Sequence, residues 1–189
     1  MRYFCFLLPL ILVAQINYAQ SHADKKFIRF VIGKEHILYT EKVGSYWIDQ
    51  IKETINQDTL YRYDGFRYYR SKLKDSDWFI LTPSEKVFIN NELDKMKDFS
   101  WKDNVVKRSF AVSKARTEKY KKEHNGQSFY DLKDFDDRIY AFTKPIFIRN
   151  NTVCFFYLES GKSPAGQLRI YVRSGKKWIL KYTPLLWVS

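Results

Sequence analysis

The sequence predicts a single α+β domain: an antiparallel sheet with a C-terminal β-meander and two or three helices packed on one face. Residues 139–189 hold short apolar segments separated by turn signals, a pattern typical of consecutive antiparallel strands. Two earlier segments show helical spacing or a helix start signal. No linker rich in Pro, Gly or Ser and no repeat divides residues 20–189, so we expect one domain after a short leader.

Residues 1–19 predict an export signal. Arg2 supplies a positive start, residues 4–13 form an apolar run, and a more polar stretch leads to Ala19. This order is typical of a secretory signal peptide, and the run is about half of the ~20 residues that span a bilayer. We expect cleavage after Ala19, with Ala23 as the alternative, and a periplasmic or secreted protein. Only an uncleaved signal would associate the chain with a membrane.

Export sets the expected chemistry of the cysteines. Cys5 leaves with the signal, so Cys154 becomes a single cysteine and no internal disulfide is expected. Cys154 lies in the apolar run 152–158, which predicts a buried, unreactive thiol. The histidines are far apart and no C-x-x-C or H-x-x-x-H pattern occurs, so we expect neither a metal site nor a cofactor.

The sequence of residues 25–70 predicts strands and one helix. Residues 25–40 are rich in β-branched and aromatic residues around Gly33, which predicts strand structure on both sides of a turn. Apolar residues at three- and four-residue spacing predict a helix over 45–57. Residues 60–70 predict a hairpin turning at Asp64-Gly65.

Two further helices have recognisable starts. Thr82, followed by Pro83 and then Glu85, predicts a capping box with proline at the first helical position, after a short extended segment. Ser113 predicts the start of a mostly polar surface helix that ends near His124. A loop with an acidic cluster is expected to follow.

The C-terminal meander is the most regular part of the sequence. Its strands are predicted at 139–148, 152–158, 167–173 and 178–182, with a final short edge strand after Pro184. The run 152–158 is apolar at successive positions and is therefore expected to be central. Leu168, Ile170 and Val172 alternate with polar residues and are expected to face the core.

The opposite face of that strand is the predicted binding surface. Arg169, Tyr171 and Arg173 lie on one side of the strand, and Lys181 and Arg149 are expected to join them from neighbouring strands. Cations alternating with an aromatic ring can hold an anionic ligand by ion pairing and stacking. The plain alternative is an ordinary solvated sheet face.

The charge distribution points to the same part of the chain. The net charge is +12, and residues 138–189 carry nine basic residues and one acidic residue, Glu159. Such an excess permits binding to an anionic component of the cell envelope, whereas export argues against a nucleic-acid partner. No feature of the sequence indicates an oligomer.

Part of the sequence resembles a known group of proteins. The features that carry the resemblance are LTPSE at 81–85, FTKPIF at 142–147, the segment 150–157 and GKKW at 175–178. In this order they resemble small exported proteins of Bacteroidota that have no assigned function, over residues 81–189. The resemblance implies a bacterial envelope or secreted protein and supplies no catalytic residues. Where such relatives carry cysteines this chain has SGKSPAG at 160–166, so no disulfide or metal role is carried over.

Together these observations predict an exported protein with a non-enzymatic binding or structural role. No convergent set of acid, base, nucleophile and metal ligands is apparent. One alternative is a hydrolase of envelope polymers that uses carboxylates such as Asp134, Asp136 and Glu159. The other is a polyanion-binding module that uses the basic face of the C-terminal sheet.

Overall fold

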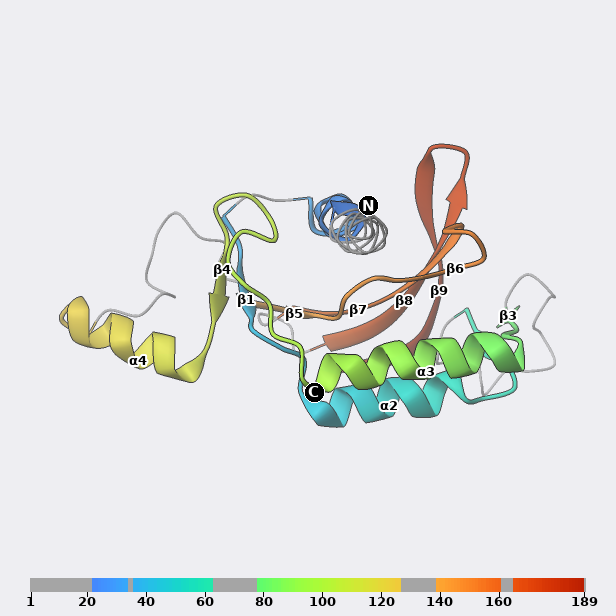
Figure 1. Cartoon of the computed structure of the whole chain (residues 1–189), viewed down its shortest axis with the longest axis horizontal. Coiled ribbons are helices and arrows are strands. Elements are labelled where there is room, and N and C mark those ends of the chain that lie inside the picture. Colours follow the sequence, from blue (N-terminus) through green and yellow to red (C-terminus); the bar gives the residue numbers. More distant parts are fainter. Residues whose placement is uncertain (1–21, 34–35, 63–77, 127–138, 161–164, 189) are drawn as a thin grey trace, which may run out of the picture.

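The computed structural model describes residues 22–33, 36–62, 78–126, 139–160 and 165–188 (Figure 1). A curved sheet lies at the centre, with two helices below it and one above it in the view of Figure 1. The prediction of an α+β domain with C-terminal strands is confirmed. The predicted hairpin turn at Asp64-Gly65 lies outside the described residues.

The main sheet has seven strands, and its pairing is mixed rather than purely antiparallel. Its strands in sheet order are β4 (Phe110–Val112), β1 (Leu38–Thr40), β5 (Ile139–Phe142), β7 (Val153–Ser160), β8 (Ala165–Ser174) and β9 (Lys177–Val188), with β6 (Ile146–Ile148) pairing to β7 beside β5. β1 runs parallel to both β4 and β5, whereas β5 to β9 pair antiparallel. The expectation of an antiparallel sheet is therefore wrong at one edge, because β1 enters from a distant part of the chain.

The C-terminal strands differ from their predicted bounds in two places. The predicted strand 139–148 is two strands, β5 and β6, which pair with different ends of β7. The segment between them includes Pro145, which lacks a backbone N–H for sheet pairing. Pro184 does not end the sheet but lies within β9, an outer strand, where one edge of the strand needs no partner.

Two antiparallel helices cover one face of the sheet, as the sequence predicts. α2 (Ser45–Ile55) and α3 (Pro83–Lys97) pack together below the sheet, and a small second sheet of β2 (Leu60–Tyr61) and β3 (Trp78–Phe79) lies at their end (Figure 1). The capping box is present: the Glu85 N–H donates to Thr82 Oγ1 at 3.2 Å, and the Thr82 N–H donates to Glu85 Oε2 at 2.9 Å. α4 (Lys114–Glu123), capped by Ser113, lies at the far end of the molecule.

Residues 22–32 form a helix on the other face, where strand structure was expected. Phe27, Ile28 and Ile32 are buried from this helix. The β-branched and aromatic content of the segment favours a strand, but apolar residues at three- and four-residue spacing form one face of a helix. Packing of that face against the sheet outweighs the modest local preference for a strand. The helices therefore lie on both faces of the sheet, not on one.

The two faces of the sheet carry two separate cores, and β7 contributes to both. Phe155 and Tyr157 point into the core shared with α2 and α3, whereas Cys154 and Phe156 point into the core under helix 22–32. All four side chains are at most 2% exposed. The prediction that this strand is central is confirmed, as is the burial of the Cys154 thiol.

Candidate functional site

The predicted binding face of β8 is partly covered in the structure. Tyr171 does share a side of the strand with the basic positions, but it is only 5% exposed. Its ring meets the Phe27 ring edge-on at 5.2 Å between centroids. Tyr171 is therefore a core residue rather than a surface platform, because helix 22–32, predicted as a strand, lies over it.

The four predicted cations do not form one surface. Arg169 is half-buried and its Nε donates to Gln167 Oε1 at 2.8 Å. Lys181 is exposed. It lies at a register shift in the β8–β9 ladder, between Leu180, which pairs with Tyr171, and Tyr182, which pairs with Ile170. Arg173 is exposed near the β8–β9 turn, where its Nε donates to the Gly175 carbonyl at 3.2 Å.

Arg149 is held on the other side of the sheet, at the start of α3. Its Nε donates to Glu85 Oε1 at 2.7 Å, and its Nη2 donates to the Ile80 carbonyl at 2.9 Å. Its guanidinium also lies 4.4 Å from the centroid of the Phe79 ring. The ion pair holds the pKa of Glu85 down to about 2, mainly through the hydrogen bond from Arg149. Arg149 therefore stabilises the fold and does not extend the predicted binding face.

A groove of about 710 Å³ lies between helix 22–32, β6, α3 and the β8–β9 turn. We call it the hairpin groove. Its aromatic lining comes from Phe27, Phe30, Phe88, Phe147 and Trp178. The Phe27 ring lies 5.3 Å from the Trp178 ring and 5.6 Å from the Phe147 ring, both in edge-on geometry, so these three rings form a packed cluster. Phe30 and Phe88 are 49% and 46% exposed, whereas most phenylalanine side chains are buried, so the groove presents apolar surface to the solvent.

The charges around the hairpin groove are mostly positive. Its lining includes four cations, Lys26, Arg173, Lys176 and Lys177, against one carboxylate, Glu92. Three of these cations come from the β8–β9 hairpin, which projects beyond the sheet in Figure 1. A two-residue turn with Gly175 at φ +58° joins the strands, a conformation that glycine adopts without strain.

A second hollow of about 500 Å³ adjoins the groove and shares Glu92 and Pro145 with it. We call it the Asp24 hollow. Consecutive residues of helix 22–32 line the two spaces, Ala23 the groove and Asp24 the hollow. The opposite wall of the hollow is the segment from Phe99 to Val105. The Trp101 indole fixes this wall by donating to the Phe142 carbonyl at 2.9 Å.

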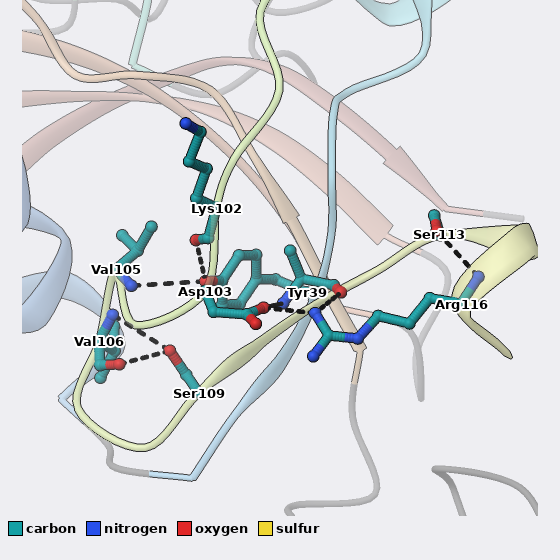
Figure 2. A network of polar contacts seen from close by, with 9 residues as sticks. Tyr39, Lys102, Asp103, Val105, Val106, Ser109, Ser113 and Arg116 are labelled. Carbon is teal, nitrogen blue, oxygen red and sulfur yellow. Dashed lines mark hydrogen bonds and ion pairs between the residues drawn. The ribbon is translucent and has the colours of Figure 1, made fainter. Parts of the chain in front are cut away.

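A polar network holds the outer part of that wall in place (Figure 2). The Tyr39 hydroxyl donates to the Lys102 carbonyl at 2.7 Å and accepts from the Val105 N–H at 3.4 Å. Asp103 Oδ1 accepts from Arg116 at 2.6 Å and from the Ala111 N–H at 2.9 Å. Burial raises the pKa of the Tyr39 hydroxyl, so this group stays a neutral donor. These hydrogen bonds pair the polar groups of the network with one another, so its role is structural.

Glu159, a carboxylate of the hydrolase alternative, lies at the end of β7. It accepts a hydrogen bond from the Tyr157 hydroxyl at 3.3 Å, and burial raises its pKa. Asp134 and Asp136 lie outside the described residues, so the proposed acid–base pairing stays a prediction. In the described part of the chain, no group of three or more His, Cys, Asp or Glu residues is arranged to hold a metal ion.

Several groove residues were not predicted from the sequence. The sequence predicts Lys26, Phe27 and Phe30 on a strand, and it predicts Phe147 and Trp178 only as members of strands. A signal was present: the apolar residues 27, 28, 31 and 32 follow helical spacing on one face. Recognising that helix would have placed Phe27 over the sheet and would have predicted the burial of Tyr171.

The three comparisons with known proteins give no relative: no family model, no curated protein and no solved structure matches this chain. Within the described residues, no helix is long and apolar enough to cross a membrane. The chemistry of the hairpin groove therefore carries the functional argument.

Proposed function

We propose that this protein is exported to the periplasm or beyond the cell and binds an anionic amphiphile of the cell envelope without catalysing a reaction. Its export is supported by the charge, apolar core and small residues of positions 1–19. The resemblance of residues 81–189 to exported Bacteroidota proteins of unassigned function supports the same compartment.

One observation carries the binding proposal: aromatic rings and cations line the same groove. A volume of about 710 Å³ is in the range of small-molecule sites. An apolar chain bound in the groove would remove the exposed rings of Phe30 and Phe88 from water, which favours binding. Arg173 and Lys177 provide charge-assisted hydrogen bonds to a phosphate or carboxylate. A ligand with both parts satisfies both features of the groove.

The placement of the cations favours a compact ligand over a long polyanion. A polymer would need a row of free cations along β8, but Arg169 is half-buried and Tyr171 is covered. Arg149 is already paired with Glu85. The positive charge near the groove is concentrated at the β8–β9 turn, where it can neutralise one headgroup.

The proposal is tested with lysophosphatidylglycerol, which has one acyl chain and one negative charge, below its critical micelle concentration. Binding to the processed protein is measured by calorimetry. The double variant R173E/K177E should weaken binding by about tenfold or more, because each lost charge-assisted contact contributes ~1 kcal/mol or more. F30A should weaken it by about threefold to tenfold, through the lost apolar contact.

The matched control is K119E/K122E on α4, which changes the net charge equally at the far end of the molecule. It should leave the affinity within about twofold, because screening limits charge effects to ~10 Å at moderate salt. Equal weakening by both double variants would show that net charge alone attracts the lipid. That result, or no binding by the wild type, would reject the hairpin groove as the site.

A further inference from the structure

The Asp24 hollow contains a buried acceptor that lacks a partner. Asp24 is 7% exposed, and its Oδ1 has no hydrogen-bond partner among the residues that the structure describes. A buried carboxylate oxygen without a donor costs ~1–3 kcal/mol or more, so most such groups are paired in folded proteins. Asp24 is one of the residues that line the hollow of about 500 Å³.

The cations around Asp24 are engaged elsewhere or make no bond to it. The Lys144 ammonium, the cation with the largest influence on Asp24, lies 4.0 Å from the centroid of the Phe99 ring. Lys95 is paired with Glu92 on α3 at 2.5 Å. Asp103, which also lines the hollow, already accepts from Arg116 and the Ala111 N–H. No described residue therefore donates to Asp24 Oδ1, and the Asp24 carboxylate is the group of the hollow that a bound donor would satisfy.

The hairpin groove next to the hollow indicates which kind of ligand could carry this hydrogen-bond donor. The Asp24 hollow and the hairpin groove meet at Glu92 and Pro145 beneath the start of helix 22–32. A ligand whose acyl chain and anionic group occupy the groove can extend past Glu92 into the hollow. There it meets the Asp24 carboxylate. Glu92, although paired with Lys95, still raises the pKa of Asp24, and a cationic donor offsets this repulsion.

We propose that the Asp24 hollow binds a primary ammonium group, so that the ligand of the hairpin groove is a zwitterionic amphiphile with N–H donors beside its anionic group. This inference rests on the proposed function of the groove. A primary ammonium offers three N–H donors, whereas a quaternary ammonium offers none. The site therefore discriminates between two headgroups of equal net charge.

The test compares two lysophospholipids with the same acyl chain, lysophosphatidylethanolamine and lysophosphatidylcholine, each below its critical micelle concentration. The protein used is the one processed by an exporting host. The wild type should bind the ethanolamine lipid about tenfold more tightly, as expected for one charge-assisted hydrogen bond. D24N, which keeps the shape of the side chain, should reduce this preference to about twofold or less. D24N should keep a cooperative urea unfolding transition, which shows that the variant is folded.

The pH dependence gives a second readout. Burial raises the pKa of Asp24 to about 6, while Lys144 lowers it and Glu92 raises it further. The other charged groups that line the hollow are Lys25, Lys95, Lys102 and Asp103. Because the ammonium binds the ionised carboxylate, affinity for the ethanolamine lipid should fall about tenfold from about pH 7.5 to about pH 5. Affinity for the choline lipid should change far less.

The outcomes separate the two proposals. Equal binding of the ethanolamine and choline lipids by the wild type overturns the ammonium site, as does a preference that survives in D24N. Loss of lysophosphatidylglycerol binding in R173E/K177E together with equal headgroup affinities supports the groove and rejects the ammonium site. A headgroup preference that depends on Asp24 but not on Arg173 or Lys177 supports the ammonium site and rejects the anion site of the groove.

Discussion

The ion pair between Arg149 and Glu85 should stabilise the fold in a way that disappears in acid. Glu85 has a pKa of about 2 in the folded protein against an ordinary value of 4.5, which sets an upper limit of ~3 kcal/mol at ~1.4 kcal/mol per pH unit. Arg149 is 40% exposed, so water and salt screen the pair, and we expect a contribution of ~1–2 kcal/mol. The folded-state pKa is depressed. The stabilisation is therefore present above pH 4.5 and is lost as the pH falls from there through about 2.

The assay is urea unfolding of E85Q, R149M and the double variant at about pH 6 and about pH 2. E85Q keeps an oxygen that can accept from the Thr82 N–H, so the helix cap is retained while the charge is removed. The coupling energy from the double-mutant cycle should be ~1–2 kcal/mol at the higher pH and near zero at the lower one. A coupling energy that is zero at about pH 6, or the same at both pH values, would refute this reasoning. R149M should also leave lysophosphatidylglycerol binding within about twofold, since Arg149 is a structural residue.

Two further predictions concern the core under helix 22–32. F27A should lower the free energy of unfolding by ~3–5 kcal/mol, measured in urea, because Phe27 is 2% exposed and contacts Phe156, Tyr171 and Trp178; a loss below ~1 kcal/mol would contradict the packing of this helix. Cys154 should resist thiol reagents in the native protein and react on unfolding, because it is fully buried and burial raises the pKa of its thiol; rapid native labelling would contradict its position in β7.

Local signals in the sequence were sufficient for some elements. The start of α3 was predictable because Thr82, Pro83 and Glu85 satisfy the helix end through bonds within four residues. The central position of β7 was predictable because a strand with apolar residues at successive positions must be covered on both faces. In both cases the short segment itself contains the information.

Other features depend on contacts between distant segments. The parallel pairing of β1 with β4 and β5 joins residues about 70 to 100 positions apart, and no local pattern specifies it. Residues 27–32 have the composition of a strand, so their helical spacing is decisive only once the sheet beneath them is known. The hairpin groove combines residues from four such segments, and for this reason only Arg173 among the five predicted binding residues lines it.

The proposed cleavage of residues 1–19 bears directly on what pairs with Asp24. Cleavage after Ala19 would leave Asp24 inside the chain, and its free Oδ1 would then depend on a ligand for a donor. Cleavage after Ala23 would instead give Asp24 its own α-ammonium, a cation within reach of the same hollow. That ammonium would compete with a ligand headgroup and would abolish the preference for ethanolamine over choline. The proposed ammonium site therefore requires a mature chain that begins at Gln20, and mass spectrometry of the mature N-terminus after expression in an exporting host decides between the two.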